Sequence, residues 1–441
     1  MSNLNRLPAK NYAYRGPIMH AFSRDDVRFL ADGGLLVDAA GTIVNCDDWQ
    51  AVKSLVTANG FEVVQLSPQN LLVPGFVDAH VHLPQMAVAG CQAENLLSWL
   101  ETHIFAEESR FADDSYAQSV SEWFFKALLA NGTTLAAVFL TSHPSASQIA
   151  FETAQRLGNR VVMGQNLMDV NAPASLLRSA PQLLAETEAL CQNWHGQADG
   201  RLQYAWVPRF ALTSSEALLS GIGALRQKYP DVYLHTHLSE QLTEIEAVKG
   251  QFPWAEDYTA VYERFGLLGG RTILAHGIHL SDDELTRLQG LDASLAHCPG
   301  SNFFLKSGRF RLMEVLNRQL RLGLGSDVGA GPELSLFKVM KDAQYMQADT
   351  LIPLKTLFYL ATLGGAIALD QQNRLGNFEP GKEADFLILD LSAKSCLNSQ
   401  KVNKQANQAK RLLSTLIYQG DDRLVEATYI CGQLVYRRPI A

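Results

Sequence analysis

PGFVDAHVHLPQ, residues 74–85, carries two histidines, His80 and His82, two positions apart at the end of an apolar run. Side chains alternate along a β-strand, so both imidazoles would point to one face of such a strand. Imidazole nitrogens are good ligands for zinc or iron, yet a lone His-x-His pair is equally well explained by core or surface histidines. The stretch therefore predicts a strand, and the rest of the chain has to decide whether this strand ends in a metal site.

Short apolar runs recur along the chain, and helical stretches separate most of them. Residues 116–130, closed by Asn131-Gly132, and residues 215–228, closed by Tyr229-Pro230, are two such helical stretches. Apolar strands that alternate with helices over about 250 residues indicate a (β/α)₈ TIM barrel of the α/β class, with a doubly wound open sheet as the alternative. The eight expected strands are residues 71–77, 134–140, 161–167, 203–208, 232–236, 272–275, 293–296 and 321–325.

The two ends of the chain differ from its middle. Short strands joined by glycine-containing turns occur in residues 33–45, 61–66, 384–390 and 426–436. We therefore expect a small β-sandwich domain formed from both chain termini, residues 1–72 and 379–441, with the barrel at residues 73–378. The polar segment 392–410 is expected to be an exposed excursion.

Composition excludes several classes of protein. The formal net charge of −8 over 441 residues argues against a nucleic-acid partner. No apolar stretch reaches the roughly 20 residues of a membrane-spanning helix, and the first residues lack the apolar core of a secretion signal. We therefore expect a cytoplasmic protein that does not bind membranes. The six cysteines form no Cys-x-x-Cys pair, so a metal site would have to use other ligands.

Further candidate ligands fall at the ends of later apolar runs. They are His235 and His237 in VYLHTHLSE, His276 in TILAHGIHL and Asp327 in LGLGSDVGAG. The carboxyl ends of the strands of a parallel barrel meet at one face, where active sites lie, so these residues predict a metal site. His235 and His237 could share a face, and strand polarity alone does not decide which of them is the ligand. Glu240 is a candidate proton donor and acceptor, although a glutamate here is also explained by the helix dipole.

With these residues assembled, the sequence resembles the amidohydrolase superfamily, and within it the guanine deaminase family, over nearly the whole chain. The His-x-His pair and GNFEPGKEADF, residues 376–386, are shared across the superfamily. The more specific segments are Pro84-Gln85, LLSWLETHIFAEESRF at residues 96–111 and VPRFALTSS at residues 207–215. This sequence departs from the family pattern at four positions on the expected pocket rim, which leave the metal ligands intact: Leu83, Ala106, Gly300 and Ser326.

The resemblance implies a hydrolase that converts guanine to xanthine and ammonia, with one zinc ion per subunit and a homodimeric assembly. The zinc ligands it implies are His80, His82, His237 and Asp327. Catalysis is implied for Glu240 as the proton shuttle, for Asp327 as the acceptor of the proton of water, and for His276 as the group facing that water. The residues implied around guanine are His82, Leu83, Pro84, Gln85, Arg209, Phe210, His237, Leu238, Ser239, Glu240 and Asp327.

Two other interpretations remain. A deaminase or hydrolase of another aminated heterocycle, such as an adenosine derivative, a pterin or a triazine, would share the fold and the metal, but Pro84-Gln85 and Pro208-Arg209-Phe210 argue against it. A non-catalytic scaffold on the same barrel would be expected to lack the metal ligands, all of which are present here.

Overall fold

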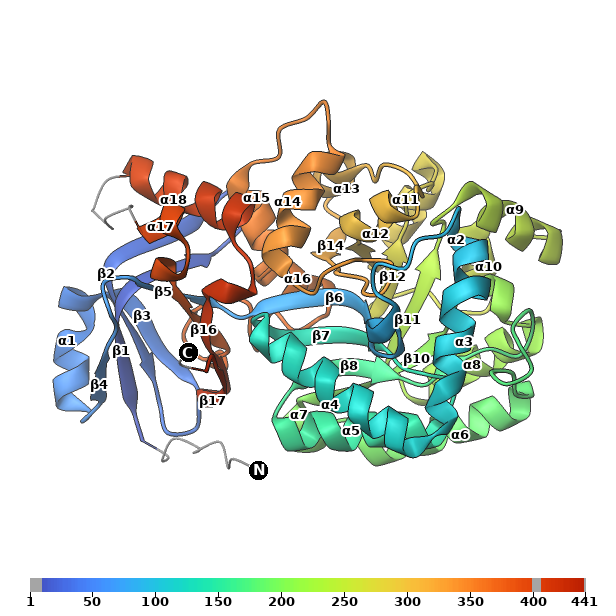
Figure 1. Ribbon diagram of the computed structural model, residues 1–441, viewed down its shortest axis with the longest axis horizontal. Helices are drawn as coiled ribbons and strands as arrows, with labels where there is room; N and C mark the ends of the chain where they lie inside the picture. Colours follow the sequence, from blue (N-terminus) through green and yellow to red (C-terminus); the bar gives the residue numbers. More distant parts are fainter. Residues whose placement is uncertain (1–9, 399–405, 440–441) are drawn as a thin grey trace.

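The computed structural model describes residues 10–398 and 406–439, which form a parallel barrel and a separate sheet made from both ends of the chain (Figure 1). All the described strand pairs along the barrel are parallel, and its last strand contacts its first, so the sheet is nearly closed. The predicted fold is confirmed. The barrel strands are β6 (Phe76–His82), β7 (Thr133–Phe139), β8 (Arg160–Gly164), β10 (Leu202–Pro208), β11 (Tyr233–Leu238), β12 (Thr272–His276), β13 (Ser294–His297) and β14 (Arg321–Leu324), and the short β9 (Asn166–Leu167) pairs with β10.

The two helices expected from the sequence are present as α4 (Asp114–Ala130) and α8 (Glu216–Lys228). Asp113 caps the N-terminus of α4: its Oδ1 accepts a hydrogen bond from the Ser115 backbone N–H at 2.8 Å. Ser215 begins the second in the same way, through the backbone N–H of Leu218 at 3.2 Å. None of the described helices is long and apolar enough to cross a membrane. Other helices around the barrel are α5 (Pro144–Leu157), α6 (Ala180–Trp194), α11 (Asp282–Gly290) and α14 (Leu336–Met346).

The second sheet joins strands from both ends of the chain in the order β17-β16-β15-β5-β1-β2-β3, with β4 paired to β1. It stands beside the barrel, and α1 (Trp49–Ala58) packs on it through Val52 and Val56 (Figure 1). The N-terminal strands are β1 (Tyr12–Ala21), β2 (Val27–Val37), β3 (Ile43–Asp48), β4 (Glu62–Gln65) and β5 (Asn70–Pro74), and the C-terminal strands are β15 (Phe386–Asp390), β16 (Val425–Ile430) and β17 (Gln433–Arg437).

One expected strand is wrong in its extent. The apolar run 71–77 divides into the end of β5, which belongs to the terminal sheet, and the beginning of β6, which belongs to the barrel. Gly75 lies between them, and a Cβ atom at this position would come within 2.0 Å of Thr134 Oγ1. The chain passes too close to β7 for any side chain at this position.

The segment expected to be an exposed excursion, residues 392–410, is helical at both of its described ends. The short α17 (Ser395–Asn398) precedes residues 399–405, which lie outside the described part, and α18 (Ala406–Gln419) follows them. Leu412, Leu416 and Ile417 of this last helix are buried. All three lie beyond residue 410. Within the polar segment Leu397 is buried and Lys410 is exposed, so the expected exposure holds only in part.

Arg160, at the beginning of β8, connects the barrel to the terminal sheet. Its Nε donates to Asp385 Oδ2 at 3.0 Å, and the guanidinium also pairs with Glu383. The side chains of Arg160 and Asp385 are each 1% exposed, so two full charges lie in the interior and depend on each other. Both acids belong to the GKEADF segment that the sequence shares with the amidohydrolases, which gives this segment a structural role.

Candidate active site

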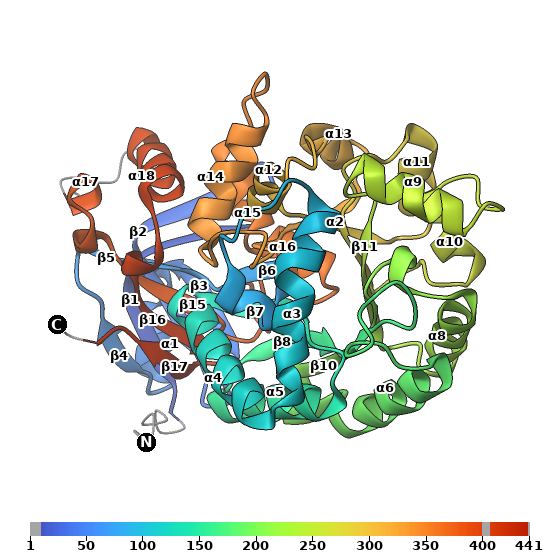
Figure 2. The ribbon, with the colours of Figure 1, turned by 45° about the vertical axis from the view of Figure 1, so that its right-hand side comes forward.

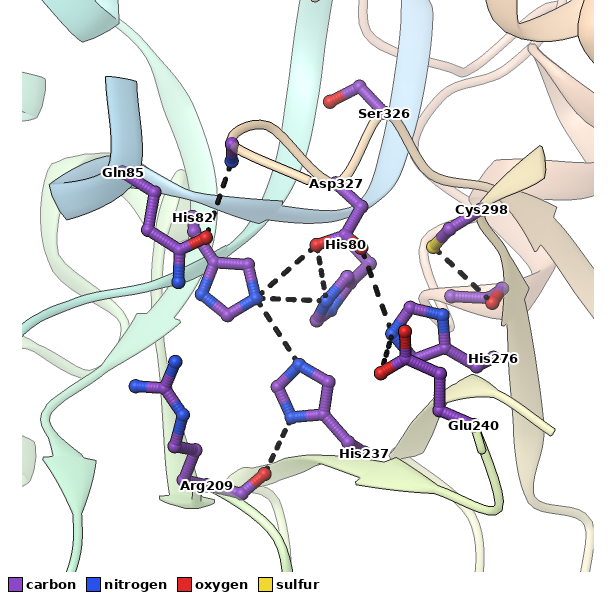
Figure 3. A network of polar contacts seen from close by, with 12 residues as sticks. His80, His82, Gln85, Arg209, His237, Glu240, His276, Cys298, Ser326 and Asp327 are labelled. Atoms are coloured by element: carbon purple, nitrogen blue, oxygen red, sulfur yellow. Dashed lines mark hydrogen bonds and ion pairs between the residues drawn. The ribbon is translucent and has the colours of Figure 1, made fainter. Parts of the chain in front are cut away.

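The ends of four barrel strands bring the predicted metal ligands and their neighbours to one place (Figure 3). β6 carries His80 and His82, β11 carries His237, β12 ends at His276, and Asp327 lies three residues after β14. This is the carboxyl end of the barrel, where loops of separate strands converge.

Four ligand atoms face one another at the centre of this cluster. His82 Nε2 lies 3.2 Å from Nε2 of His80 and 3.2 Å from Nε2 of His237. Asp327 Oδ1 lies 3.2 Å from His80 Nε2 and 3.4 Å from His82 Nε2. Nitrogen and oxygen ligands about 2.0–2.1 Å from a tetrahedral ion stand about 3.3–3.4 Å from one another. The spacing of the four atoms therefore fits a single metal ion.

The protonation of the imidazoles supports the same conclusion. Burial holds the pKa values of His80, His82 and His237 well below the ordinary value, so these rings are neutral. His237 Nδ1 lies 2.6 Å from the backbone oxygen of Arg209, which can only accept, so Nδ1 carries the proton and Nε2 a lone pair. His80 Nδ1 lies 2.8 Å from His235 Nε2. His235 is thus behind His80, and His237 is the member of its pair that faces the other ligands.

Glu240 and His276 lie beside the ligands as a buried, oppositely charged pair. Glu240 Oε2 is 3.4 Å from His276 Nε2, and Ser307 Oγ donates to Glu240 Oε1 at 3.1 Å. Burial raises the pKa of Glu240 to about 7 despite the opposing effect of His276. Burial alone would lower the pKa of His276, but Glu240 and Asp327 raise it above the ordinary value. Glu240 can therefore gain and lose a proton near neutral pH.

The backbone at two strand ends adopts the left-handed conformation, with φ of 70° at His276 and 50° at Asp327. Each such residue costs about 1–3 kcal/mol unless the surrounding structure holds it. Here Asp327 N donates to His80 O at 2.9 Å, and Gly277 N donates to Leu238 O at 2.8 Å. The strain turns both functional side chains toward the cluster.

A pocket of about 380 Å³ opens onto the cluster. Its polar walls are His82, Gln85, Arg209, His237, Glu240, Glu244, His276 and Asp327, and its apolar walls are Leu96, Trp99, Leu100, Phe210, Leu305 and Ala330. The other residues expected around the substrate, Leu83, Pro84, Leu238 and Ser239, are not among the lining residues.

Two acidic residues at this site, Glu244 and Glu108, were not predicted from the sequence. Glu244 accepts hydrogen bonds from the backbone N–H groups of Glu240 at 2.9 Å and Gln241 at 3.1 Å, and so fixes the turn that carries Glu240. The sequence offered a signal for Glu244, because Gln241 and Glu244 are spaced as a capping box. They form one at the N-terminus of the helix α9 (Leu242–Gln251).

Glu108 is the second of these residues, and it is fully buried. Both of its oxygens accept hydrogen bonds from Arg209 Nη1, at 2.9 and 2.8 Å. It lies in the LLSWLETHIFAEESRF segment, where two adjacent glutamates gave no reason to choose between them.

Comparison with known proteins matches residues 71–435 to the amidohydrolase family. Guanine deaminase of Escherichia coli (strain K12) is 38% identical over 417 residues, which cover 93% of each chain. Among solved structures, E. coli guanine deaminase superposes with a TM-score of 0.91 at 35% identity, covering 98% of this chain and 100% of that one. Guanine deaminase from C. acetobutylicum, solved with guanine bound in its active site, gives a TM-score of 0.88 at 28% identity, covering 97% and 100%.

Proposed function

The chain belongs to the amidohydrolase family, and from this we propose that it acts as a guanine deaminase, converting guanine and water to xanthine and ammonia. The observation that carries the proposal is the composition of one pocket. Three of the candidate metal ligands, His82, His237 and Asp327, form one part of its wall together with Glu240. Arg209 and Gln85 add hydrogen-bond donors to the same pocket. A site for hydrolysis and a site for a polar ring edge thus share one cavity.

Arg209 and Phe210 suit the two surfaces of a purine. A guanidinium remains charged at all relevant pH values and donates only, which matches the O6 oxygen of guanine. Phe210 is 4% exposed and supplies an apolar surface for the ring. Adenine carries an amino group where guanine carries O6, so its N–H would meet the N–H of Arg209.

We assign the metal as zinc, one ion per chain, held by His80, His82, His237 and Asp327. Three imidazoles and one carboxylate at tetrahedral spacing support this assignment. When bound, such an ion supplies a nucleophile by activating water at neutral pH.

The side chains around the ligands divide the proton transfers. Asp327 accepts a proton from the attacking water, and Glu240 in its protonated form donates to N3 of the guanine ring as C2 is attacked. The pKa of about 7 lets Glu240 take back a proton from the hydroxyl group now on C2, while the proton held by Asp327 passes to the 2-amino group. His276 faces both carboxylates, at 3.4 Å from Glu240 and 3.7 Å from Asp327, and its charge stabilises the site while the 2-amino group leaves as ammonia.

The homodimer and the cytoplasmic location expected from the resemblance are also part of this proposal. Light scattering on the purified protein tests the first, and fractionation of the source cells tests the second. A monomeric mass would remove the homodimer from the proposal and leave the chemistry of the pocket untouched.

The decisive experiment incubates purified, zinc-loaded protein with guanine and follows conversion to xanthine by ultraviolet absorbance. Adenine serves as the parallel substrate, and we expect guanine to be turned over and adenine to be rejected. Absence of guanine turnover by protein that holds one zinc per chain would refute the proposal. Pterins, triazines and adenosine derivatives would then be the next substrates to assay.

A further inference from the structure

Glu108 lies behind the pocket wall, in the short helix α3 (Phe105–Ser109), and is not itself one of the lining residues. In Figure 2, α3 and the preceding α2 (Leu96–Trp99) lie in front of the barrel strands. Glu108 is 0% exposed, Gln85 is 1% and Arg209 is 2%. Glu108 Oε1 accepts from Gln85 Nε2 at 3.1 Å, in addition to the two contacts with Arg209 Nη1. One buried carboxylate therefore holds both polar residues that would face the substrate ring.

These contacts fix which way the amide of Gln85 points. A carboxylate only accepts hydrogen bonds, so the amide nitrogen must face Glu108. On the other side, the backbone N–H of Gly329 only donates, and it lies 3.3 Å from Gln85 Oε1. Figure 3 shows the amide oxygen turned toward this backbone nitrogen and the amide nitrogen on the side of Arg209. Turning the amide over would break both contacts at once.

The N–H groups of Arg209 and Gln85 that are left over for a ligand are donors. Within residues 10–398 and 406–439, no acceptor bonds to the Nε or Nη2 of Arg209 or to the second amide hydrogen of Gln85. The oxygen of Gln85 accepts from the Gly329 backbone N–H, which leaves it one further lone pair. A ligand edge that meets the N–H groups of these residues must carry acceptors.

We infer that Glu108 is a specificity-determining positioning residue, which holds Arg209 and Gln85 so that their N–H donors face the O6/N7 edge of a purine. This inference rests on the proposed function and deepens it. In guanine, C2 lies across the six-membered ring from C5, and C5 joins the carbon that bears O6 to N7. A ring with C2 at the metal ligands turns its O6/N7 edge away from them, and both atoms of that edge are acceptors.

Glu108→Gln tests this role with little change in shape. A glutamine offers one oxygen and one NH₂ group, so it cannot accept from Arg209 and Gln85 through two oxygens as the carboxylate does. Either Arg209 loses acceptors or an NH₂ group faces the amide nitrogen of Gln85. Arg209 and Gln85 should then no longer present a fixed pattern of N–H donors to the ring.

The readout is the ratio of kcat/KM for guanine to kcat/KM for 2,6-diaminopurine, both followed by ammonia release. Both compounds carry the 2-amino group, but the second has an amino donor in place of O6. We expect the wild-type ratio to fall by about tenfold or more in Glu108→Gln, mainly through a higher KM for guanine. A variant that was merely less well folded would lose activity on both substrates and keep the ratio.

Glu107→Gln is the matched control, because Glu107 lies on the same helix but pairs with Arg110 at 2.8 Å and with Tyr116. This control should keep the wild-type ratio. A folded Glu108→Gln protein with wild-type zinc content and an unchanged ratio would overturn the inference. If the wild type fails to deaminate guanine at all, the proposed function is refuted instead.

A measurement on the wild type covers the case in which Glu108→Gln does not fold. 7-Deazaguanine keeps O6 and replaces the N7 acceptor with a C–H group. We expect its kcat/KM to be at least about tenfold below that of guanine, because one fixed donor is left unpaired. Equal kcat/KM values for the two compounds would contradict the two-acceptor edge, and with it the role assigned to Glu108.

Discussion

His276 Nε2 lies 3.4 Å from Oε2 of Glu240, while the opposite nitrogen of the ring, Nδ1, lies 3.0 Å from Oδ1 of Asn302. The amide oxygen accepts a hydrogen bond from Nδ1–H, so a second proton on His276 resides on Nε2 and faces Glu240. The carboxyl group of Glu240, the proposed proton shuttle, therefore has this nitrogen of His276 as its neighbour on one side. On another side, Ser307 Oγ holds its second oxygen at 3.1 Å.

Glu240→Gln should abolish most guanine turnover, because an amide preserves the shape of the side chain but cannot exchange a proton. Loss of a positioned acid and base lowers kcat by about 10²- to 10⁴-fold. The change in ultraviolet absorbance as guanine is converted to xanthine measures the rate. Metal analysis checks that zinc is retained. Glu246→Gln, at an exposed position on the helix α9 that follows Glu240, should keep the wild-type rate. Full activity in Glu240→Gln would show that another group moves the proton.

Removal of the metal by a chelator should eliminate activity and lower the melting temperature. The folded protein presents four ligands at the right spacing, whereas the unfolded chain does not, so bound metal adds about 3–4 kcal/mol of stability at 100 to 1,000 times its dissociation constant. Scanning calorimetry before and after chelation measures the shift. In the same assays His237→Ala should lose zinc, whereas His103→Ala, whose ring contacts the Gln92 carbonyl at 3.2 Å, should retain it. Equal melting temperatures with and without metal would contradict the ligand set.

Arg160→Met should destabilise the protein by about 3–5 kcal/mol, because Asp385 would be left as a buried, unpaired charge. Arg160→Met/Asp385→Leu should recover much of this loss, since it removes both charges. Denaturant unfolding measures all three proteins. Lys10→Met, which breaks the solvent-exposed pair with Glu62, should leave the unfolding midpoint unchanged. A double variant no more stable than Arg160→Met would contradict the coupling of the two charges.

His20 should make the protein less stable as the pH falls. Burial lowers the pKa of His20 to about 4, with Arg28 and Lys382 lowering it further and Glu379 opposing them. Its Nδ1 accepts from the Phe378 backbone N–H at 3.3 Å. Between an unfolded pKa near 6.5 and a folded pKa near 4, only the unfolded chain binds the proton, so stability is full above about pH 6.5 and declines below it.

His20→Gln measures this contribution, because glutamine does not titrate and still offers an acceptor. The wild type should lose roughly 2 kcal/mol more than His20→Gln between pH 7 and pH 5. Denaturant unfolding at the two pH values gives the difference. If both proteins lose the same free energy of unfolding between the two pH values, the pKa of His20 is not lowered in the folded state.

The convergence of the candidate ligands was predictable from the sequence, because the strands of a parallel barrel all end at the same face. His80, His237 and Asp327 each follow an apolar run, and the fold brings all such positions to one face. The choice between His235 and His237 was not available from the sequence. It depends on which ring lies deeper along β11, and only the three-dimensional structure gives that depth.

Glu108 could not be predicted for a different reason. It meets Arg209 across 101 residues of sequence, through the packing of a short helix on the pocket wall, and no strand or helix period encodes that contact. The division of the run 71–77 between two sheets is a similar case. Hydrophobicity reports that a strand is buried, and it does not report which sheet buries it.

The pairing of β5 with β15 has a consequence for synthesis of the protein on the ribosome. Pro74 lies opposite Phe386, so the sheet begun by the first strands is completed only after more than three hundred further residues have been translated. Until then, one edge of β5 has unpaired backbone groups while the barrel strands that follow it are emerging. A nascent chain that stalls before residue 386 presents this open edge to other strands, so translation pauses in this region should favour aggregation.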